Sequence, residues 1–152
     1  MSIAIVEERP DCADAMQLIA ELETTLAPHY PPESRHGYSV EKLLRESVAF
    51  FLARHDDTLV GCGGVQFFGT EYAEVKRMYV RPRYRGLGLG KLLLNHLAEY
   101  SRRRGITVLR LETGIHQDAA IGLYVHVGFQ RIPPFGAYRE DPLSVFFEKH
   151  LA

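Results

Sequence analysis

The stretch Arg81–Lys91, RPRYRGLGLGK, lies between a segment rich in β-formers and an amphipathic segment. Its three glycines alternate with leucines and follow three arginines. Glycine allows the backbone to approach a ligand closely, and the start of a helix offers unpaired N–H groups and a positive dipole end. The stretch therefore predicts a strand-to-helix corner that binds phosphate through main-chain amides, assisted by the charges of Arg83, Arg85 and Lys91.

Two common phosphate-binding motifs do not fit this corner. The P-loop pattern requires a glycine at Arg85 and a serine or threonine at Leu92. The dinucleotide pattern G-x-G-x-x-G fails because Lys91 stands where the third glycine belongs. A glycine-rich turn with solvated arginines stays open as a purely structural alternative.

Hydrophobic periodicity predicts the elements on either side of the corner. Apolar residues at helical spacing indicate helices, and runs rich in β-branched and aromatic residues indicate strands. The expected helices cover residues 11–27, 40–47, 91–104 and 117–127, and the expected strands cover residues 2–8, 48–54, 59–68, 71–80, 106–113, 129–132 and 143–151. Asp11 and Ser39 are expected to cap the first two helices.

This order of elements predicts an α/β fold with a mixed sheet and helices on its faces. The segment 106–113 is apolar at almost every position up to Leu111, which favours a central strand. We expect residues 1–152 to form a single domain. An exposed edge strand near the C-terminus makes a homodimer one candidate assembly.

The composition excludes several function classes. The 18 basic residues nearly balance 19 acidic ones, and the net charge of −1 argues against a nucleic-acid binder. No apolar run approaches the length of a membrane span, so we expect no membrane association. Cys12 and Cys62 lack a metal-ligand spacing, and two free thiols fit a cytoplasmic location. The seven histidines form no ligand pattern, and we expect no metal.

A second motif stands in register with the first. Arg83–Gly88 fits R-x-x-G-x-G, and Ala120–Phe129 fits A-x-x-L-Y-x-x-x-G-F. Together these motifs resemble the GNAT superfamily of acetyl-CoA-dependent N-acetyltransferases, most strongly over Glu71–Arg131. The resemblance implies a GNAT-like sheet of six or seven strands, flanked by about four helices, with a splay between the fourth and fifth strands.

The resemblance also implies where acetyl-CoA binds. Its pantetheine arm would lie in the splay and pair with the main chain of Met78, Tyr79 and Val80. The N–H groups around the pyrophosphate would come from Arg85, Gly86, Leu87, Gly88, Leu89, Gly90 and Lys91. Gln117 stands where the family often carries an asparagine that binds pantetheine, so its amide is expected to reach the same group from one methylene further out.

Moving an acetyl group from a thioester to an amine needs a neutral amine, oxyanion donors and a proton for the departing thiolate. By resemblance, Tyr124 is expected to be the general acid, and the N–H of Met78 or a neighbour the oxyanion donor. Glu74 is the expected base, with Glu112 or a relayed water as alternatives. Alternation along the strand should place Glu74, Lys76, Met78 and Val80 on one face. A core tyrosine and a Glu74–Lys76 ion pair are the structural alternatives.

The acceptor is expected to be a primary amine on a small molecule, attacked directly through a tetrahedral intermediate. The family usually lines this site with two loops, here residues 28–38 and 133–142. Glu33, Glu140 or Asp141 would suit a cationic acceptor, and Arg35 or Arg139 an acidic one.

Two other function classes remain as alternatives. A CoA-binding sensor or regulatory module without turnover would not need an acid at Tyr124. A nucleotide-binding protein is disfavoured by the failed phosphate motifs. We therefore expect an enzyme of the N-acetyltransferase class.

Overall fold

A computed structural model describes residues 2–151 of the chain. The helices of this part are α1 (Ala13–Leu26), α2 (Val40–Arg45), α3 (Leu89–Arg102) and α4 (Asp118–His126). Its strands are β1 (Ile3–Glu7), β2 (Ala49–His55), β3 (Thr58–Phe68), β4 (Tyr72–Val80), β5 (Val108–Gly114), β6 (Gln130–Ile132) and β7 (Ser144–His150). Each predicted helix and strand is found in the predicted order, with ends that differ by a few residues.

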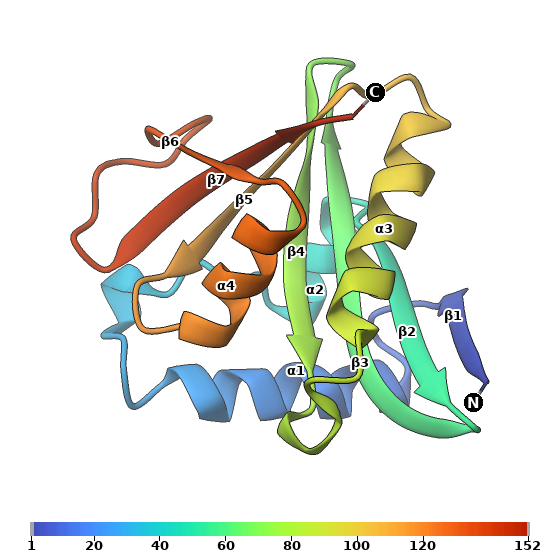
Figure 1. Cartoon of the computed structure of the whole chain (residues 1–152). Helices are drawn as coiled ribbons and strands as arrows, with labels where there is room; N and C mark the ends of the chain where they lie inside the picture. Colours follow the sequence, from blue (N-terminus) through green and yellow to red (C-terminus); the bar gives the residue numbers. More distant parts are fainter. Residues whose placement is uncertain (1, 152) are drawn as a thin grey trace.

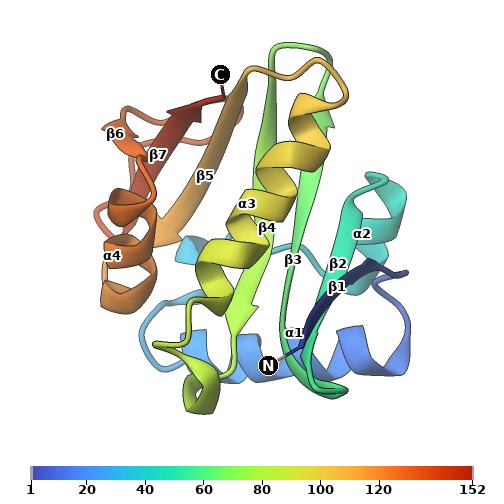
Figure 2. The ribbon, with the colours of Figure 1, turned by 45° about the vertical axis from the view of Figure 1, so that its right-hand side comes forward.

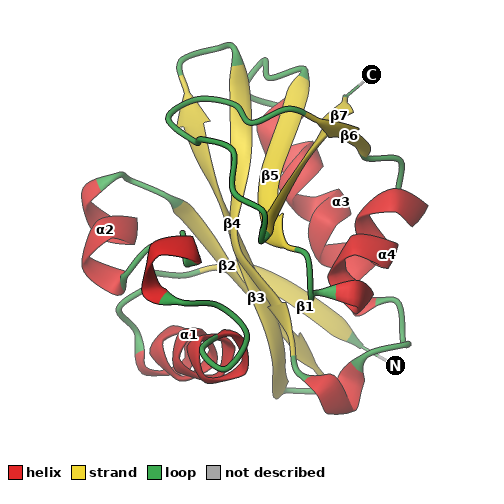
Figure 3. Cartoon of the chain, turned by 90° about the vertical axis from the view of Figure 1, so that its left-hand side faces the viewer, coloured by secondary structure: helices red, strands yellow, loops and turns green. Residues whose placement is uncertain are grey.

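The strands form one mixed sheet in the order β1-β2-β3-β4-β5-β7-β6 (Figure 1). Helices α1 and α2 cover one face, and α3 and α4 cover the other (Figure 3). Strand β5 lies between β4 and β7, in the interior of the sheet as its apolar sequence predicts. The α/β fold class is therefore confirmed, and β1 and β6 are the edge strands.

The sheet splits between β4 and β5. These parallel strands pair only at Ala73–Leu109 and Glu74–Arg110. Beyond these pairs the strands diverge toward the end that carries the loop before α3 and the start of α4 (Figures 1 and 2). The predicted splay is thus present, and it exposes the end of β4 to a ligand.

The two longest helices, α1 and α3, each bury one apolar stripe against the sheet. Helix α1 buries Ala15, Leu18, Ile19 and Leu22 in a core that also contains Phe50 of β2. Helix α3 buries an equivalent stripe on the opposite face. Both stripes follow the spacing of three and four residues that predicted these helices.

The two predicted helix caps have different outcomes. The Ser39 side chain accepts a hydrogen bond from the N–H of Lys42 at 3.2 Å, as expected for an N-cap. The prediction that Asp11 caps α1 is wrong, because α1 begins after Cys12 and has no side-chain cap. Asp11 instead accepts two hydrogen bonds of 2.9 Å from the Arg9 guanidinium.

A bulge interrupts β4 at Arg77. This residue has a φ of +53°, and the register with β3 shifts between Cys62 and Gly64. The buried guanidinium of Arg77 donates from Nε to the carbonyl of Tyr38 at 2.9 Å and forms an ion pair with Glu23 of α1. Contacts from the α1 side therefore hold this extra residue in place.

The bulge reverses the alternation of side chains along β4. Val75 and Met78 both pack in the core beneath α3, although they are three residues apart. Glu74 and Lys76 point to the opposite face, where they contact Tyr138. The expectation that Glu74, Lys76, Met78 and Val80 share a face is wrong, since one inserted residue shifts every later side chain to the other face. Val80, like Met78, packs on the α3 side.

Candidate functional site

A groove of about 740 Å³ follows the splay from the end of β4 to the start of α4. Among its lining residues are nearly all of those predicted to bind the cofactor, namely Met78, Tyr79, Val80, Arg85, Gly86, Gly88, Leu89, Gly90, Lys91 and Gln117. Leu87 is the exception, and its side chain is 49% exposed to solvent. The Tyr79 phenol points toward Glu21 of α1, so Tyr79 offers the groove its main chain.

The corner between β4 and α3 is an open recess lined by main chain. Gly86 and Gly88 have φ values of +84° and +80°, which side-chain-bearing residues rarely adopt. A Cβ atom added to either glycine would meet no other atom within 4 Å. Gly88 caps α3, whose first N–H groups have no partner within the helix. The recess thus fits a diphosphate group.

The basic side chains at this corner have separate roles. Arg85 and Lys91 line the groove, and Arg83 is exposed outside it. The Nε of Arg85 donates to a main-chain carbonyl at the end of β4 at 3.0 Å. Arg81 turns away from the groove and forms an ion pair with Glu21 of α1 at 2.8 Å. Positive charge at the recess therefore comes from Arg85 and Lys91.

Tyr30 orients Gln117, and the sequence did not predict this contact. The Tyr30 hydroxyl accepts a hydrogen bond from the N–H of His116 at 2.9 Å and donates to Oε1 of Gln117 at 3.2 Å. Its ring fits against β5 because Gly114 has no side chain, since a Cβ there would lie 2.0 Å from the hydroxyl oxygen. Occupation of Oε1 leaves the amide NH₂ of Gln117 as the group that can face a ligand.

Tyr124 lies where the groove meets a second, smaller cavity of about 120 Å³. Its side chain comes from α4, is 5% exposed, and contacts the rings of Phe129 and Phe147. Burial raises the pKa of the Tyr124 phenol above its ordinary value, and the negative charge of Glu112 adds to this effect. The phenol is therefore neutral at physiological pH and can donate a proton.

The smaller cavity contains a buried polar network around Glu74. Lys76 Nζ donates to Glu74 Oε2 at 2.7 Å, and the Tyr138 hydroxyl donates to the same oxygen at 2.6 Å. Burial lowers the pKa of Lys76, and Glu74 opposes this effect by favouring the ammonium form. Lys76 Nζ also lies 4.0 Å from the centre of the Tyr38 ring. Tyr138, which the sequence had not singled out, thus joins Glu74 at the site.

Glu112, near the end of β5, is another carboxylate in the cavity lining, which also includes Glu23. Its Oε2 accepts a hydrogen bond from the Ser144 hydroxyl at 2.9 Å. Burial raises the pKa of Glu112, while the hydrogen bond from Ser144 opposes the shift. Unlike Glu74, this carboxylate has no cationic side chain within 4 Å among residues 2–151.

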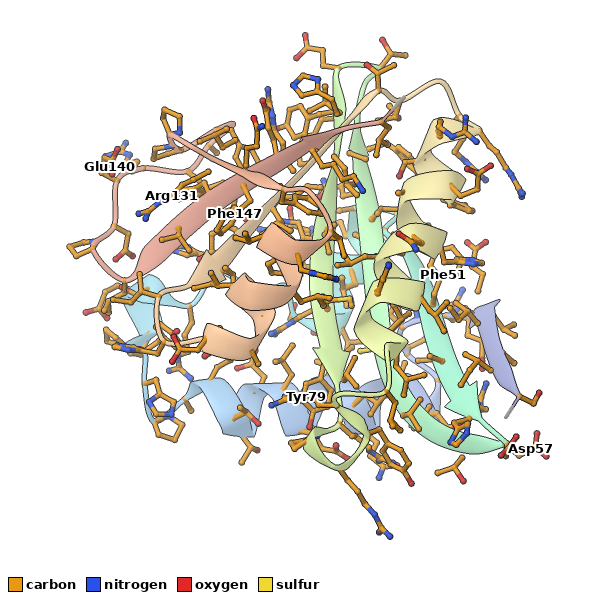
Figure 4. All side chains as sticks on the ribbon, in the orientation of Figure 1. Phe51, Asp57, Tyr79, Arg131, Glu140 and Phe147 are labelled. Carbon is orange, nitrogen blue, oxygen red and sulfur yellow. The ribbon has the colours of Figure 1, made fainter. Side chains whose placement is uncertain are left out.

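The loops predicted to bind the acceptor contribute unequally to this cavity. Among their predicted charged residues, Arg35 lines the cavity. Asp141 lies 3.6 Å from the His36 imidazole and accepts a hydrogen bond from the N–H of Leu143. Glu140 lies on the outer side of the loop between β6 and β7 (Figure 4). Glu33 and Arg139 are likewise outside the cavity lining.

Within residues 2–151, no three His, Cys, Asp or Glu side chains are placed to hold a metal ion together. Over the same residues, no helix has the length and apolar character needed to cross a bilayer.

The Acetyltransferase (GNAT) family model matches residues 14–129. The chain is 41% identical over 152 residues to an IAA acetyltransferase of Azospirillum brasilense, covering 99% of each protein. It is also similar to the crystal structure of a putative acyl-CoA N-acyltransferase of Klebsiella pneumoniae, with a TM-score of 0.83, 36% identity and coverage of 99% and 98% of the two chains. A PaiA N-acetyltransferase of Thermoplasma acidophilum, solved in complex with coenzyme A, aligns with a TM-score of 0.78 and 27% identity over 99% of both chains.

Proposed function

The chain belongs to the GNAT family of acetyltransferases, and from this premise we propose that it acetylates a primary amine on a small molecule with its groove, Tyr124 and a cavity carboxylate. Its dependence on acetyl-CoA follows from the family, and the similar structure solved with coenzyme A supports it. We further propose that residues 1–152 act as one domain in the cytoplasm. Assembly into a homodimer through the β6 edge also remains a proposal.

One observation carries the proposed reaction. The groove and the smaller cavity share five lining residues, namely Leu22, Met78, Gln117, Ala120 and Tyr124. A long ligand in the groove and a separate molecule in the cavity would therefore meet at Tyr124. This arrangement suits a transfer between two substrates, because proximity of the reacting groups supplies much of the rate.

The corner and β4 would hold the cofactor in place. Main-chain N–H groups from residues 85–91 suit the diphosphate, and the end of β4 with the Gln117 amide suits the pantetheine arm. Acetyl-CoA supplies the acetyl group as a reactive thioester. Half-buried Met78 and buried Tyr124 restrict water at the same point.

Tyr124 is proposed to protonate the departing thiolate. Its phenol is protonated at physiological pH, which a proton donor requires, and its raised pKa makes it a weaker acid than a free tyrosine. Its position also has a structural role, because its ring packs in the core with Phe129 and Phe147. The two roles are compatible, since the ring packs while the hydroxyl faces the junction.

Glu74 and Glu112 are both proposed participants in removing the amine proton. The contacts favour Glu112 as the acceptor of that proton, because its pKa is raised and it has no ion-pair partner within the described residues. Glu74 already neutralises Lys76 and binds Tyr138, so its carboxylate suits a positioning role. A water relay from either carboxylate would serve the same purpose.

A small acceptor is supported by two facts. The cavity is small, at about 120 Å³, and lies behind the loops 28–38 and 133–142. The similar protein of A. brasilense is named an IAA acetyltransferase.

The test is an assay of CoA release from acetyl-CoA over a panel of primary amines, using wild type and Tyr124→Phe. We expect turnover with some amines, and a loss of about 10²-fold in kcat for the variant with unchanged CoA affinity. Binding of acetyl-CoA without turnover of any amine would instead support a sensor module. Wild-type turnover by Tyr124→Phe would assign Tyr124 to packing alone.

A further inference from the structure

The charged side chains that line the smaller cavity are mostly paired with one another. Lys76 pairs with Glu74 at 2.7 Å, and Arg77 pairs with Glu23. His36, also in the lining, lies 3.6 Å from Asp141. The Lys76–Glu74 and Arg77–Glu23 pairs neutralise their own charges and leave no strong demand for a counter-ion from a ligand.

Arg35 is an unpaired cation in this lining. Its Nε is buried and has no hydrogen-bond partner among residues 2–151, and no carboxylate of those residues lies within 4 Å of its guanidinium. Leaving this buried N–H unsatisfied costs free energy, because it has lost its water without gaining a partner, while Arg35 as a whole is half-buried. The main chain holds Arg35 in this position, since its N–H donates to the carbonyl of Pro32 at 3.2 Å.

Glu112 is the unpaired anion of the same lining. The Ser144 hydroxyl is its hydrogen-bond donor, and a hydroxyl carries no compensating charge. Arg35 and Glu112 do not pair with each other, because they lie more than 4 Å apart. The cavity therefore offers one unmatched positive and one unmatched negative group at separate points.

We propose that the acceptor is an α-amino acid or a closely similar zwitterion, whose carboxylate binds Arg35 and whose amine lies between Glu112 and Tyr124. This inference rests on the proposed function and names its substrate class. A guanidinium suits a carboxylate because its N–H groups match the two oxygens in a bidentate pair. The ammonium of the same ligand would neutralise Glu112, which then lies in place to accept the proton.

The test compares L-amino acids with their carboxamides, which keep the amine and side chain but lack the carboxylate. Titration calorimetry on the CoA-loaded protein measures binding, and CoA release from acetyl-CoA measures turnover. We expect at least one L-amino acid to bind and react better than its carboxamide by about 10- to 100-fold. Equal binding of acid and carboxamide across the panel would overturn the proposal.

Arg35→Gln tests the named residue. It should raise the KM of the preferred amino acid by about 10- to 100-fold, with a smaller effect on kcat, and should leave the carboxamide unchanged. Arg131→Gln is the matched control, since Arg131 is exposed on β6 outside the cavity (Figure 4). Equal losses for acid and carboxamide would overturn the role of Arg35.

The calorimetric binding measurement distinguishes a failure of this proposal from a failure of the proposed function. If amino acids bind through Arg35 and no amine of any panel is acetylated, the acetyl transfer proposed above is wrong and the zwitterion site stands as a binding site alone. If amines without a carboxylate are acetylated and amino acids are not, the enzyme stands and the zwitterion site is wrong.

Discussion

Gly86 and Gly88 show how single residues create the recess that we propose for the cofactor. Both have positive φ values, and a Cβ added at either position would point into open space. A side chain at either position would strain the backbone and enter the space that the diphosphate needs. Backbone strain and occupation of the recess can be separated by experiment, because other glycines also have a positive φ but do not face the groove.

Gly86→Ala is predicted to lose most of its affinity for acetyl-CoA. Gly69→Ala is the matched control, because Gly69 also has a positive φ and a Cβ there would meet no atom within 4 Å, but it lies in the turn after β3. Both variants should lose about 1 kcal/mol of stability from the strained conformation. Calorimetric titration with CoA should show a loss of affinity for Gly86→Ala alone, and equal affinities would contradict the phosphate-recess role.

The Glu112 carboxylate, proposed to accept the amine proton, is predicted to lower the free energy of unfolding. Its folded-state pKa is raised, so the fold favours the protonated form. The resulting penalty is absent below the ordinary glutamate pKa, grows as pH rises through the raised folded pKa, and is complete above it.

Glu112→Gln removes this charge and keeps an acceptor for Ser144. The variant should have a higher Tm than wild type at about pH 7.5, and the difference should vanish at about pH 4. Thermal unfolding at both pH values measures the effect. An unchanged or lower Tm at the higher pH would show that Glu112 carries no such penalty, and turnover should fall in either case if it is the base.

At the scale of elements, the sequence predicted what depends on local pattern. The helices follow from apolar spacing, the interior position of β5 from its continuous apolar run, and the corner from its glycines. The splay and the groove came from the family resemblance. All of these features are encoded within one or two neighbouring elements.

Contacts between distant segments could not be predicted from the sequence. The bulge at Arg77 depends on Glu23 of α1 and the Tyr38 carbonyl, and Tyr30 reaches Gln117 across 87 positions of the chain. Tyr138 reaches Glu74 in the same way. The prediction from alternation assumes that β4 is an unbroken strand. It failed after Arg77, because the bulge adds one residue to β4 there.

The pair between Arg77 and Glu23 is predicted to hold the bulge. Glu23→Gln should cost about 2 kcal/mol, because it leaves a buried guanidinium without a counter-charge. Glu99→Gln is the control, since both carboxylate side chains are 41% exposed but Glu99 faces exposed arginines on α3. Its ion pairs should contribute less than about 1 kcal/mol.

Urea unfolding of the two variants measures this difference. Weaker acetyl-CoA binding is also expected for Glu23→Gln, since the bulge directs Met78 toward the groove. Equal stabilities of the two variants would mean that the bulge is held by other contacts.

At the scale of the whole molecule, one sheet supports both the groove and the smaller cavity that adjoins it. Strand β4 supplies Met78 and leads into the corner before α3. Strand β5 supplies Glu112, and α4 supplies Tyr124. Because β4 and β5 pair at only two positions, the two parts diverge and leave the site between them. Transfer between two substrates is therefore a property of the split sheet and of no single element.

A crystal structure of the protein with acetyl-CoA would test this division of the sheet most directly. We expect the diphosphate to lie against the main-chain N–H groups of residues 85–91, and the thioester sulfur to lie within hydrogen-bonding distance of the Tyr124 hydroxyl, about 3.5 Å. A cofactor bound elsewhere, or a corner filled by the side chains of Arg83 and Arg85, would contradict this expectation.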